Sequence, residues 1–158
     1  MRVAVIGGSA IDEQTYERAV LVGQSLGDRG HAVVCGGLGG VMEAVCEGAR
    51  SAGVETIGVL PGENREAANE WVTTPIATGL GNARNVLVVL NGDAVIAIDG
   101  STGTLSEIGH ALDFGRPVAG LDTHDIDDAG FEAVETPQGA VEHVERAASD
   151  RDRDSNAD

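Results

Sequence analysis

The chain has 158 residues, of which 42% are hydrophobic and only 3% aromatic, so it is long enough for one globular domain with an aliphatic core. Its net charge of −16 repels nucleic-acid phosphates and argues against a DNA or RNA partner. No apolar run reaches the roughly 18 residues of a membrane span, and the N-terminus enters a strand pattern directly. We therefore expect no membrane partner, no signal peptide and a cytoplasmic location.

The basic residues are all arginines, and lysine is absent. Acidic surfaces without lysine resemble those of proteins from salt-loving archaea. At molar salt the Debye length is about 3 Å, which screens the self-repulsion of such a surface. We expect a halophilic protein; the alternative is an ordinary acidic protein from a mesophile.

Strand and helix patterns alternate along the chain. The expected strands, in chain order, cover residues 1–6, 31–35, 54–60, 94–98, 116–121 and 131–134. Residues 71–78 are strand-like but interrupted by Pro75, which suits an edge strand or an irregular strand. The expected helices cover residues 12–28, 41–50, 83–90, a segment that ends near 115, and 138–148, with a loop or short helix over 63–70. The acidic tail 149–158 is expected to be disordered.

This alternation predicts an α/β fold. Right-handed βαβ units would build a mainly parallel sheet with helices on both faces, as one Rossmann-like domain over residues 1–148. In such sheets a ligand binds at the carboxyl ends of the strands, near the point where the strand order reverses.

Glycine-rich turns follow three of the predicted strands, at Gly7–Ser9, Gly36–Gly40 and Gly100–Thr104. The last turn opens a helix, whose unpaired N–H groups and positive dipole end suit a phosphate. None of these turns forms a nicotinamide-dinucleotide fingerprint or a P-loop, so a dehydrogenase and a P-loop NTPase are disfavoured. The histidines lack metal-ligand spacing, and we expect neither a metal nor a resident cofactor.

The two cysteines, Cys35 and Cys46, do not form a C-x-x-C motif. We expect them to be small buried residues, since a disulfide is disfavoured in a cytosolic chain.

Three motifs carry a family resemblance: Gly36-Gly-Leu-Gly-Gly-Val-Met42, Asn82-Ala-Arg-Asn85 and Gly100-Ser-Thr-Gly-Thr-Leu-Ser-Glu107. Over about residues 1–122 the chain resembles the Lonely Guy (LOG)-like Rossmann superfamily, which includes cytokinin-activating phosphoribohydrolases and molybdenum cofactor carriers. The phosphoribohydrolase motif reads P-G-G-x-G-T-x-x-E. Here Asp99-Gly-Ser101 replaces Pro-Gly-Gly, and Asn85 stands where that family has lysine.

The resemblance implies that Arg84 and Glu107 form a catalytic pair and that Gly103 and Thr104 hold a 5′-phosphate. The other expected ligand-binding residues are Gly8, Ser9, Gly37, Gly39, Gly40, Asn82, Gly100, Ser101 and Thr102.

Structural alternatives compete with these assignments. Thr104 and Glu107 have the spacing of a capping box, in which both side chains would satisfy N–H groups at a helix start. Arg84 could be a surface residue paired with an acidic neighbour. His110, one turn after Glu107, could orient that carboxylate, but a partly buried helix position is favoured for it.

Two functions follow from the resemblance. One is hydrolysis of the N-glycosidic bond of a nucleoside 5′-monophosphate, which would release a base and ribose 5-phosphate. The alternative is a carrier or sensor that binds a phosphorylated pterin-like or nucleotide ligand without turnover. The partner is in either case a small phosphorylated molecule, and the resemblance implies a homodimer or homotetramer.

Overall fold

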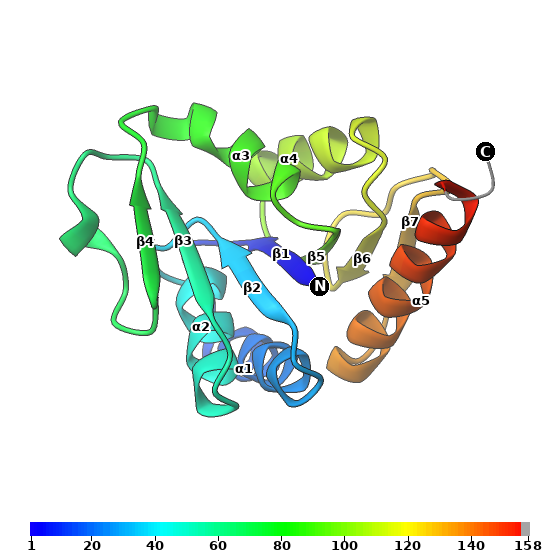
Figure 1. Cartoon of the computed structure of the whole chain (residues 1–158), viewed down its shortest axis with the longest axis horizontal. Coiled ribbons are helices and arrows are strands. Elements are labelled where there is room, and N and C mark those ends of the chain that lie inside the picture. The colour runs from blue at the N-terminus through cyan, green and yellow to red at the C-terminus, as the bar shows by residue number, and fades with distance from the viewer. Residues whose placement is uncertain (156–158) are drawn as a thin grey trace.

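The computed structural model describes residues 1–155 and shows one parallel α/β unit (Figure 1). Its strands are β1 (Arg2–Gly7), β2 (Ala32–Cys35), β3 (Thr56–Leu60), β4 (Thr74–Ala77), β5 (Ala94–Ile98), β6 (Val118–Leu121) and β7 (Phe131–Val134). Its helices are α1 (Glu13–Asp28), α2 (Val41–Ser51), α3 (Asn85–Leu90), α4 (Thr102–Asp113) and α5 (Pro137–Ser155), with short 3₁₀ turns η1 (Arg65–Ala67) and η2 (Gly81–Arg84).

The seven strands are ordered β4-β3-β2-β1-β5-β6-β7, and every neighbouring pair is parallel. The strand order therefore reverses beside β1, which lies between β2 and β5. The sequence prediction of a Rossmann-like α/β fold is confirmed. Strand β4, which contains Pro75, lies at the sheet edge as predicted, where a residue without an N–H is tolerated.

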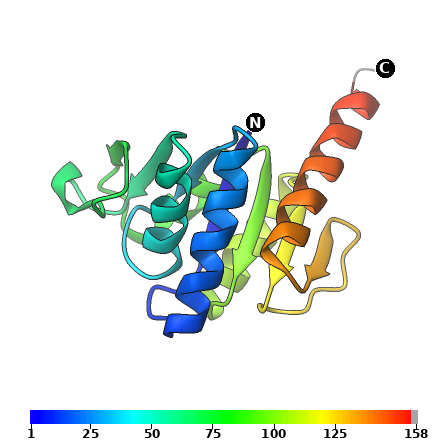
Figure 2. The ribbon, with the colours of Figure 1, turned by 90° about the horizontal axis from the view of Figure 1, so that it is seen from below.

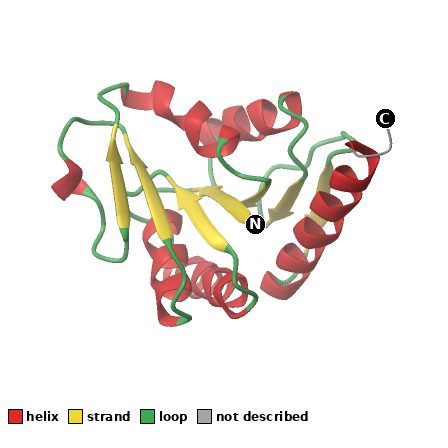
Figure 3. Ribbon diagram, in the orientation of Figure 1, coloured by secondary structure: helices red, strands yellow, loops and turns green. Residues whose placement is uncertain are grey.

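Helices cover both faces of the sheet (Figure 3). Helices α1, α2 and α5 pack on one face, which Figure 2 shows from below, and α3 and α4 pack on the other. Successive β1 residues divide between the two cores: Val3 and Val5 face α1 and α2, whereas Ala4 and Ile6 face α3 and α4. All four are buried, as a parallel strand between helix layers requires.

The predicted helix over 83–90 is broken at its start. Residues Gly81–Arg84 form the 3₁₀ turn η2, and α3 begins only at Asn85. Val88 and Val89 are buried, but Leu90 at the end of the helix is 43% exposed.

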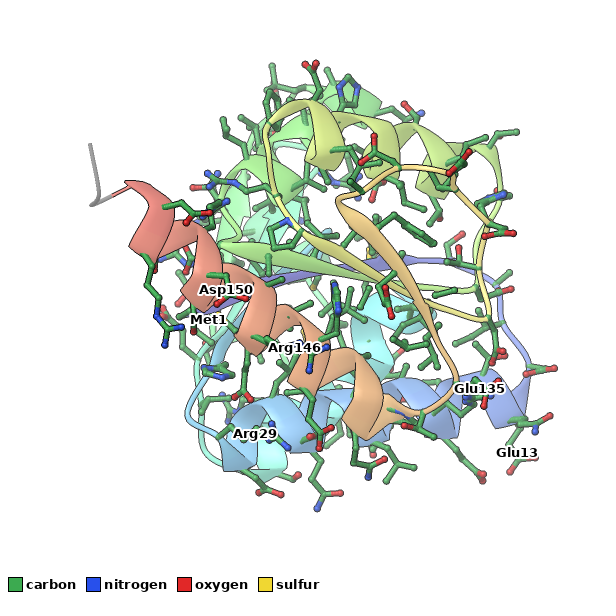
Figure 4. All side chains as sticks on the ribbon, turned by 90° about the vertical axis from the view of Figure 1, so that its right-hand side faces the viewer. Met1, Glu13, Arg29, Glu135, Arg146 and Asp150 are labelled. Carbon is green, nitrogen blue, oxygen red and sulfur yellow. The ribbon has the colours of Figure 1, made fainter. Side chains whose placement is uncertain are left out.

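The C-terminal helix is longer than predicted. We expected it to end near Ala148, but α5 continues to Ser155, so the prediction of disorder from Ser149 is wrong up to that residue. Residues 156–158 lie outside the described part. The first half of α5 is held by packing and by charge: Arg29 lies beside it in Figure 4 and pairs with Glu145 at 2.5 Å, and His31 Nε2 lies 2.6 Å from the same carboxylate.

Within residues 1–155, no helix is both long and apolar enough to cross a membrane.

Helices α1 and α2 approach at backbone distance through two glycines. A Cβ on Gly48 would lie 2.0 Å from the Val20 carbonyl oxygen, and one on Gly23 would lie 2.1 Å from the Val45 carbonyl oxygen. These positions leave no room for a methyl group without separating the helices.

We expect Gly48→Ala to destabilise the protein by about 1–3 kcal/mol, because overpacking outweighs the better helix propensity of alanine. Gly109→Ala is the matched control, since Gly109 lies on α4 with open space around its Cβ position. There the same change should stabilise by roughly 0.5–1 kcal/mol. Chemical denaturation measures both, and equal effects would contradict the close helix contact.

Candidate functional site

A cavity of about 270 Å³ opens beside the carboxyl ends of β1 and β5. These ends coincide because Gly7 pairs with Ile98 in the sheet, so the turns that follow both strands face one space. Eight of the predicted site residues line the cavity, namely Gly8, Ser9, Asn82, Arg84, Ser101, Gly103, Thr104 and Glu107. The cavity thus lies at the predicted switch point of the sheet.

The other predicted glycines support the cavity without lining it. Gly40, with φ of 68°, packs the second turn against the first, because a Cβ there would lie 2.3 Å from the Gly8 carbonyl oxygen. The N–H of Val41 donates to the same oxygen at 2.9 Å. Gly37 also has a positive φ, of 76°, and its carbonyl accepts from the Asn69 N–H at 2.9 Å. Gly39 likewise lies off the lining.

The start of α4 forms one wall. Its first intrahelical bond joins the Leu105 N–H to the Ser101 carbonyl at 3.0 Å, so the amides of Thr102, Gly103 and Thr104 have no partner within the helix. Ser101, at the N-cap, makes no side-chain cap bond. Gly100 has φ of 104°, which favours glycine.

Thr104 is the most buried polar residue of this wall, with 5% of its surface exposed. Its Oγ1 lies against Gly100, where an added Cβ would be only 2.1 Å away. It also lines the cavity, so its hydroxyl stands beside the open amides of the helix start. Thr102, in contrast, is exposed and off the lining.

The capping-box alternative for Thr104 and Glu107 is wrong. It requires Thr104 at the N-cap, but α4 begins at Thr102, which places Thr104 in the first turn and Glu107 beyond it. Glu107 therefore does not cap this helix, and its position on the cavity wall has no such structural explanation.

Arg84 is buried, with 7% of its surface exposed, so the alternative of a surface ion pair is also wrong. Its guanidinium donates to the carbonyl oxygens of Val59 at 2.7 Å and Gly36 at 3.3 Å, and to Oδ1 of Asn85. These contacts hold the side chain at the junction of η2 and α3. The arginine thus joins the turn after β2 to strand β3 and presents its charge to the cavity.

Glu107 lines the same cavity as Arg84. Burial raises the pKa of the Glu107 carboxyl to about 7, and the positive charge of Arg84 opposes part of that rise. A carboxyl group with such a pKa can both give and take a proton near neutral pH. His110 stacks on Phe114 with ring centroids 6.3 Å apart, in agreement with the favoured helix-residue assignment.

Sequence reasoning missed several lining residues. Apolar Leu38, Met42 and Val88 give the cavity a hydrophobic side, and Gly36 and Asn85 complete the surroundings of Arg84. Asn85 could have been found, since it directly follows Arg84 at the position where the family motif has lysine. The apolar residues gave no signal because they also fit a buried helix face. No cluster of three or more metal-ligating side chains occurs among residues 1–155.

The fold is that of a Rossmann-like protein, and its cavity lies at the switch point of the sheet. The chain belongs to the SLOG cluster4 family, whose model matches residues 1–150. This confirms the expected placement in the LOG-like superfamily.

Three known proteins illustrate the similarity. An uncharacterised protein of Archaeoglobus fulgidus is 41% identical over 143 residues, which cover 90% of this chain and 93% of that protein. The molybdenum cofactor binding protein of Rippkaea orientalis is 32% identical, with a TM-score of 0.86 over 92% of this chain and 95% of that one. The molybdenum cofactor carrier protein of Chlamydomonas reinhardtii is 29% identical, with a TM-score of 0.87 over 94% of this chain and 98% of that one.

The raised pKa of Glu107 predicts a pH-dependent stability. The folded-state pKa of about 7 lies above the ordinary value of 4.5, so the fold favours the protonated carboxyl group. The stabilisation that this group contributes is therefore fully present below pH 4.5 and is lost as the pH rises through 7. We expect Glu107→Gln to remove that loss and to be more stable than the wild type at pH 8 by up to about 3 kcal/mol. Urea unfolding between pH 5 and 8 measures it. Glu17→Gln, at an exposed position of α1, is the control. The same pH dependence of stability in the wild type and in Glu107→Gln would refute the raised pKa of Glu107.

Proposed function

We propose that this protein binds a small phosphorylated ligand of the pterin type and carries it without turnover, as a molybdenum cofactor carrier does. The observation that carries the proposal is the wall at the start of α4, where free amides stand beside the hydroxyl of Thr104. Such a helix start binds phosphate through N–H groups and the helix dipole. The names of two structural neighbours, which match over more than nine-tenths of both chains, favour a molybdenum cofactor as cargo.

The cavity suits a ligand with one anionic and one apolar part. Leu38, Met42 and Val88 can pack against a flat ring system, while the phosphate lies at α4. Arg84 and Glu107 are the only charged residues on the described lining, so its formal charges balance when both are ionised. A ligand of low charge therefore fits better than a polyphosphate.

We expect Thr104→Val to weaken cargo binding by about 1.5 kcal/mol, or roughly tenfold, because the phosphate loses one hydrogen bond while the side chain keeps its shape. The protein is mixed anaerobically with molybdenum cofactor released from a molybdoenzyme, and the molybdenum retained after gel filtration is measured. Thr102→Val, on the exposed neighbour, is the control and should retain as much as the wild type. Absence of retention by the wild type would refute the carrier function.

A second candidate function is hydrolysis of a nucleoside 5′-monophosphate at the N-glycosidic bond. The specific observation that favours it is Glu107, whose raised pKa and place on the same cavity lining as Arg84 suit acid–base chemistry on a bound ribose. The carboxyl group would protonate the leaving base or activate water, and the wall of α4 would position the phosphate.

This second candidate predicts that free base is released from a panel of nucleoside 5′-monophosphates. Glu107→Gln should lower the rate by at least about 100-fold, since it removes the proton donor and acceptor. Chromatography of the free base gives the rate, at both low and molar potassium chloride because a halophilic protein needs salt to fold. If the wild type binds a nucleotide but releases no base, the hydrolase is excluded and the carrier is not.

Assembly, location and salt adaptation stay predictions. A homodimer or homotetramer is supported by apolar side chains that the single chain leaves uncovered, among them Leu80, which is 53% exposed, and Ile76, which is 44% exposed.

A further inference from the structure

Two thiols lie directly beneath the cavity wall. Cys35 ends β2 and Cys46 lies in the middle of α2; both are fully buried, and their Sγ atoms are 3.5 Å apart without a bond between them. They are the only cysteines of the chain. The distance is close enough for a disulfide after a small movement, since bonded sulfurs lie about 2.05 Å apart.

The pair is connected to the residues that line the cavity. The Gly37 N–H donates to Cys35 Sγ at 3.4 Å, and the Met42 carbonyl oxygen lies 3.9 Å from the same sulfur. Gly36, the next residue after Cys35, and Met42 both line the cavity. Any movement of the Cys35 sulfur therefore acts on a turn that forms the cavity wall.

Asn69 connects Cys46 to the same wall. Its side-chain amide donates to the Leu38 carbonyl at 2.9 Å, and its own N–H donates to the Gly37 carbonyl at 2.9 Å. The polar side chain of Asn69 also lies close enough to lower the pKa of the Cys46 thiol. The thiols, Asn69 and the Gly36–Gly40 turn thus form one packed unit.

We propose that Cys35 and Cys46 are a peroxide-sensitive pair whose disulfide, once formed, alters the cavity wall and weakens ligand binding. Cys35 is the attacking sulfur, because its Sγ lies 3.5 Å from that of Cys46, accepts a hydrogen bond from the Gly37 N–H and is near the Arg84 guanidinium, and these groups lower the pKa of its thiol. The hydrogen-bonding contact with Cys35 and burial raise the pKa of the Cys46 thiol.

The chemistry needs one peroxide per pair. The Cys35 thiolate attacks a peroxide oxygen and breaks the O–O bond; hydroxide leaves as water after protonation, and a sulfenic acid forms. The Cys46 sulfur then attacks Cys35 Sγ, loses its proton and displaces the second oxygen as water. In total two thiols lose two protons and two electrons, and hydrogen peroxide is reduced to two waters.

Closure of the disulfide requires movement near the ligand. The sulfurs must approach by about 1.5 Å, the difference between 3.5 Å and the bonded distance. Oxidant reaches the buried pair when the Gly36–Gly40 turn opens toward the cavity, so a bound ligand should slow oxidation. The effect on ligand binding rests on the proposed function, whereas formation of the disulfide does not.

The first experiment uses the wild-type chain with hydrogen peroxide. Mass spectrometry of non-reduced peptides should show a Cys35–Cys46 disulfide that dithiothreitol reverses, and fluorescence of the single Trp71, whose N–H donates to Asn69 Oδ1 at 3.0 Å, should change with the same time course. Cys46→Ser should instead accumulate a sulfenic acid at Cys35, trapped by dimedone. Oxidation of both sulfurs to higher acids without a disulfide would overturn the proposal. This outcome can be detected in the wild-type chain alone.

The second experiment compares retention of released molybdenum cofactor by reduced and oxidised protein. We expect oxidation to weaken retention about tenfold, within the usual range of coupling between two sites. Cys35→Ser is the control, and it should retain the same amount of cofactor with and without peroxide treatment. Equal retention by the reduced and disulfide forms would overturn the coupling, whereas no retention by the reduced form would refute the carrier function and leave the disulfide standing.

Discussion

The pairing of β1 with β5 is the interaction on which the rest of the site depends. Gly7 lies opposite Ile98, and a Cβ on Gly7 would be 2.1 Å from the Ile98 carbonyl oxygen. The contact admits no side chain, so the two strand ends remain together. Because the strand order reverses at this pair, no crossover helix covers the space beyond it, and the turns after both strands are open to a ligand.

The electrostatics of the cavity differ from those of the surface. The chain carries a net charge of −16, but the described cavity lining holds one cation and one carboxyl group. An anion must therefore be held mainly by backbone N–H groups, whose dipoles act at short range. Arg84 donates to two backbone carbonyl oxygens of the fold, so it contributes to the shape of the site as well as to its charge.

The thiol pair connects the cavity wall to the buried core of the sheet. Cys35 occupies the last position of a buried strand, and the chain turns into the cavity wall directly after it. A packed interior transmits small displacements because it has few voids. Chemistry at a sulfur beneath the wall can therefore reach the ligand without any contact between them.

The sequence allowed much of the fold to be predicted, and the errors have physical causes. The α5 prediction ended too early because the polar residues after Ala148 lack an apolar face, yet an exposed helix can continue from a well-packed first half. The helix at 83–90 was expected as one piece because local patterns do not distinguish a 3₁₀ turn from a first α-helical turn. The capping box was wrong because Gly100 allows a turn that starts α4 earlier.

Local patterns in the sequence were enough to predict the alternation of strands and helices, and hence the parallel sheet, because residue periodicity and glycine positions are local properties. The same local patterns predicted the turns that line the cavity and the two ionisable residues beside them. What those residues touch depends on the folded structure: Arg84 is buried among carbonyl oxygens, Glu107 lines the same cavity with a raised pKa, and the two cysteines lie in contact. Burial and through-space charge depend on packing between segments far apart in the chain, which no local pattern contains.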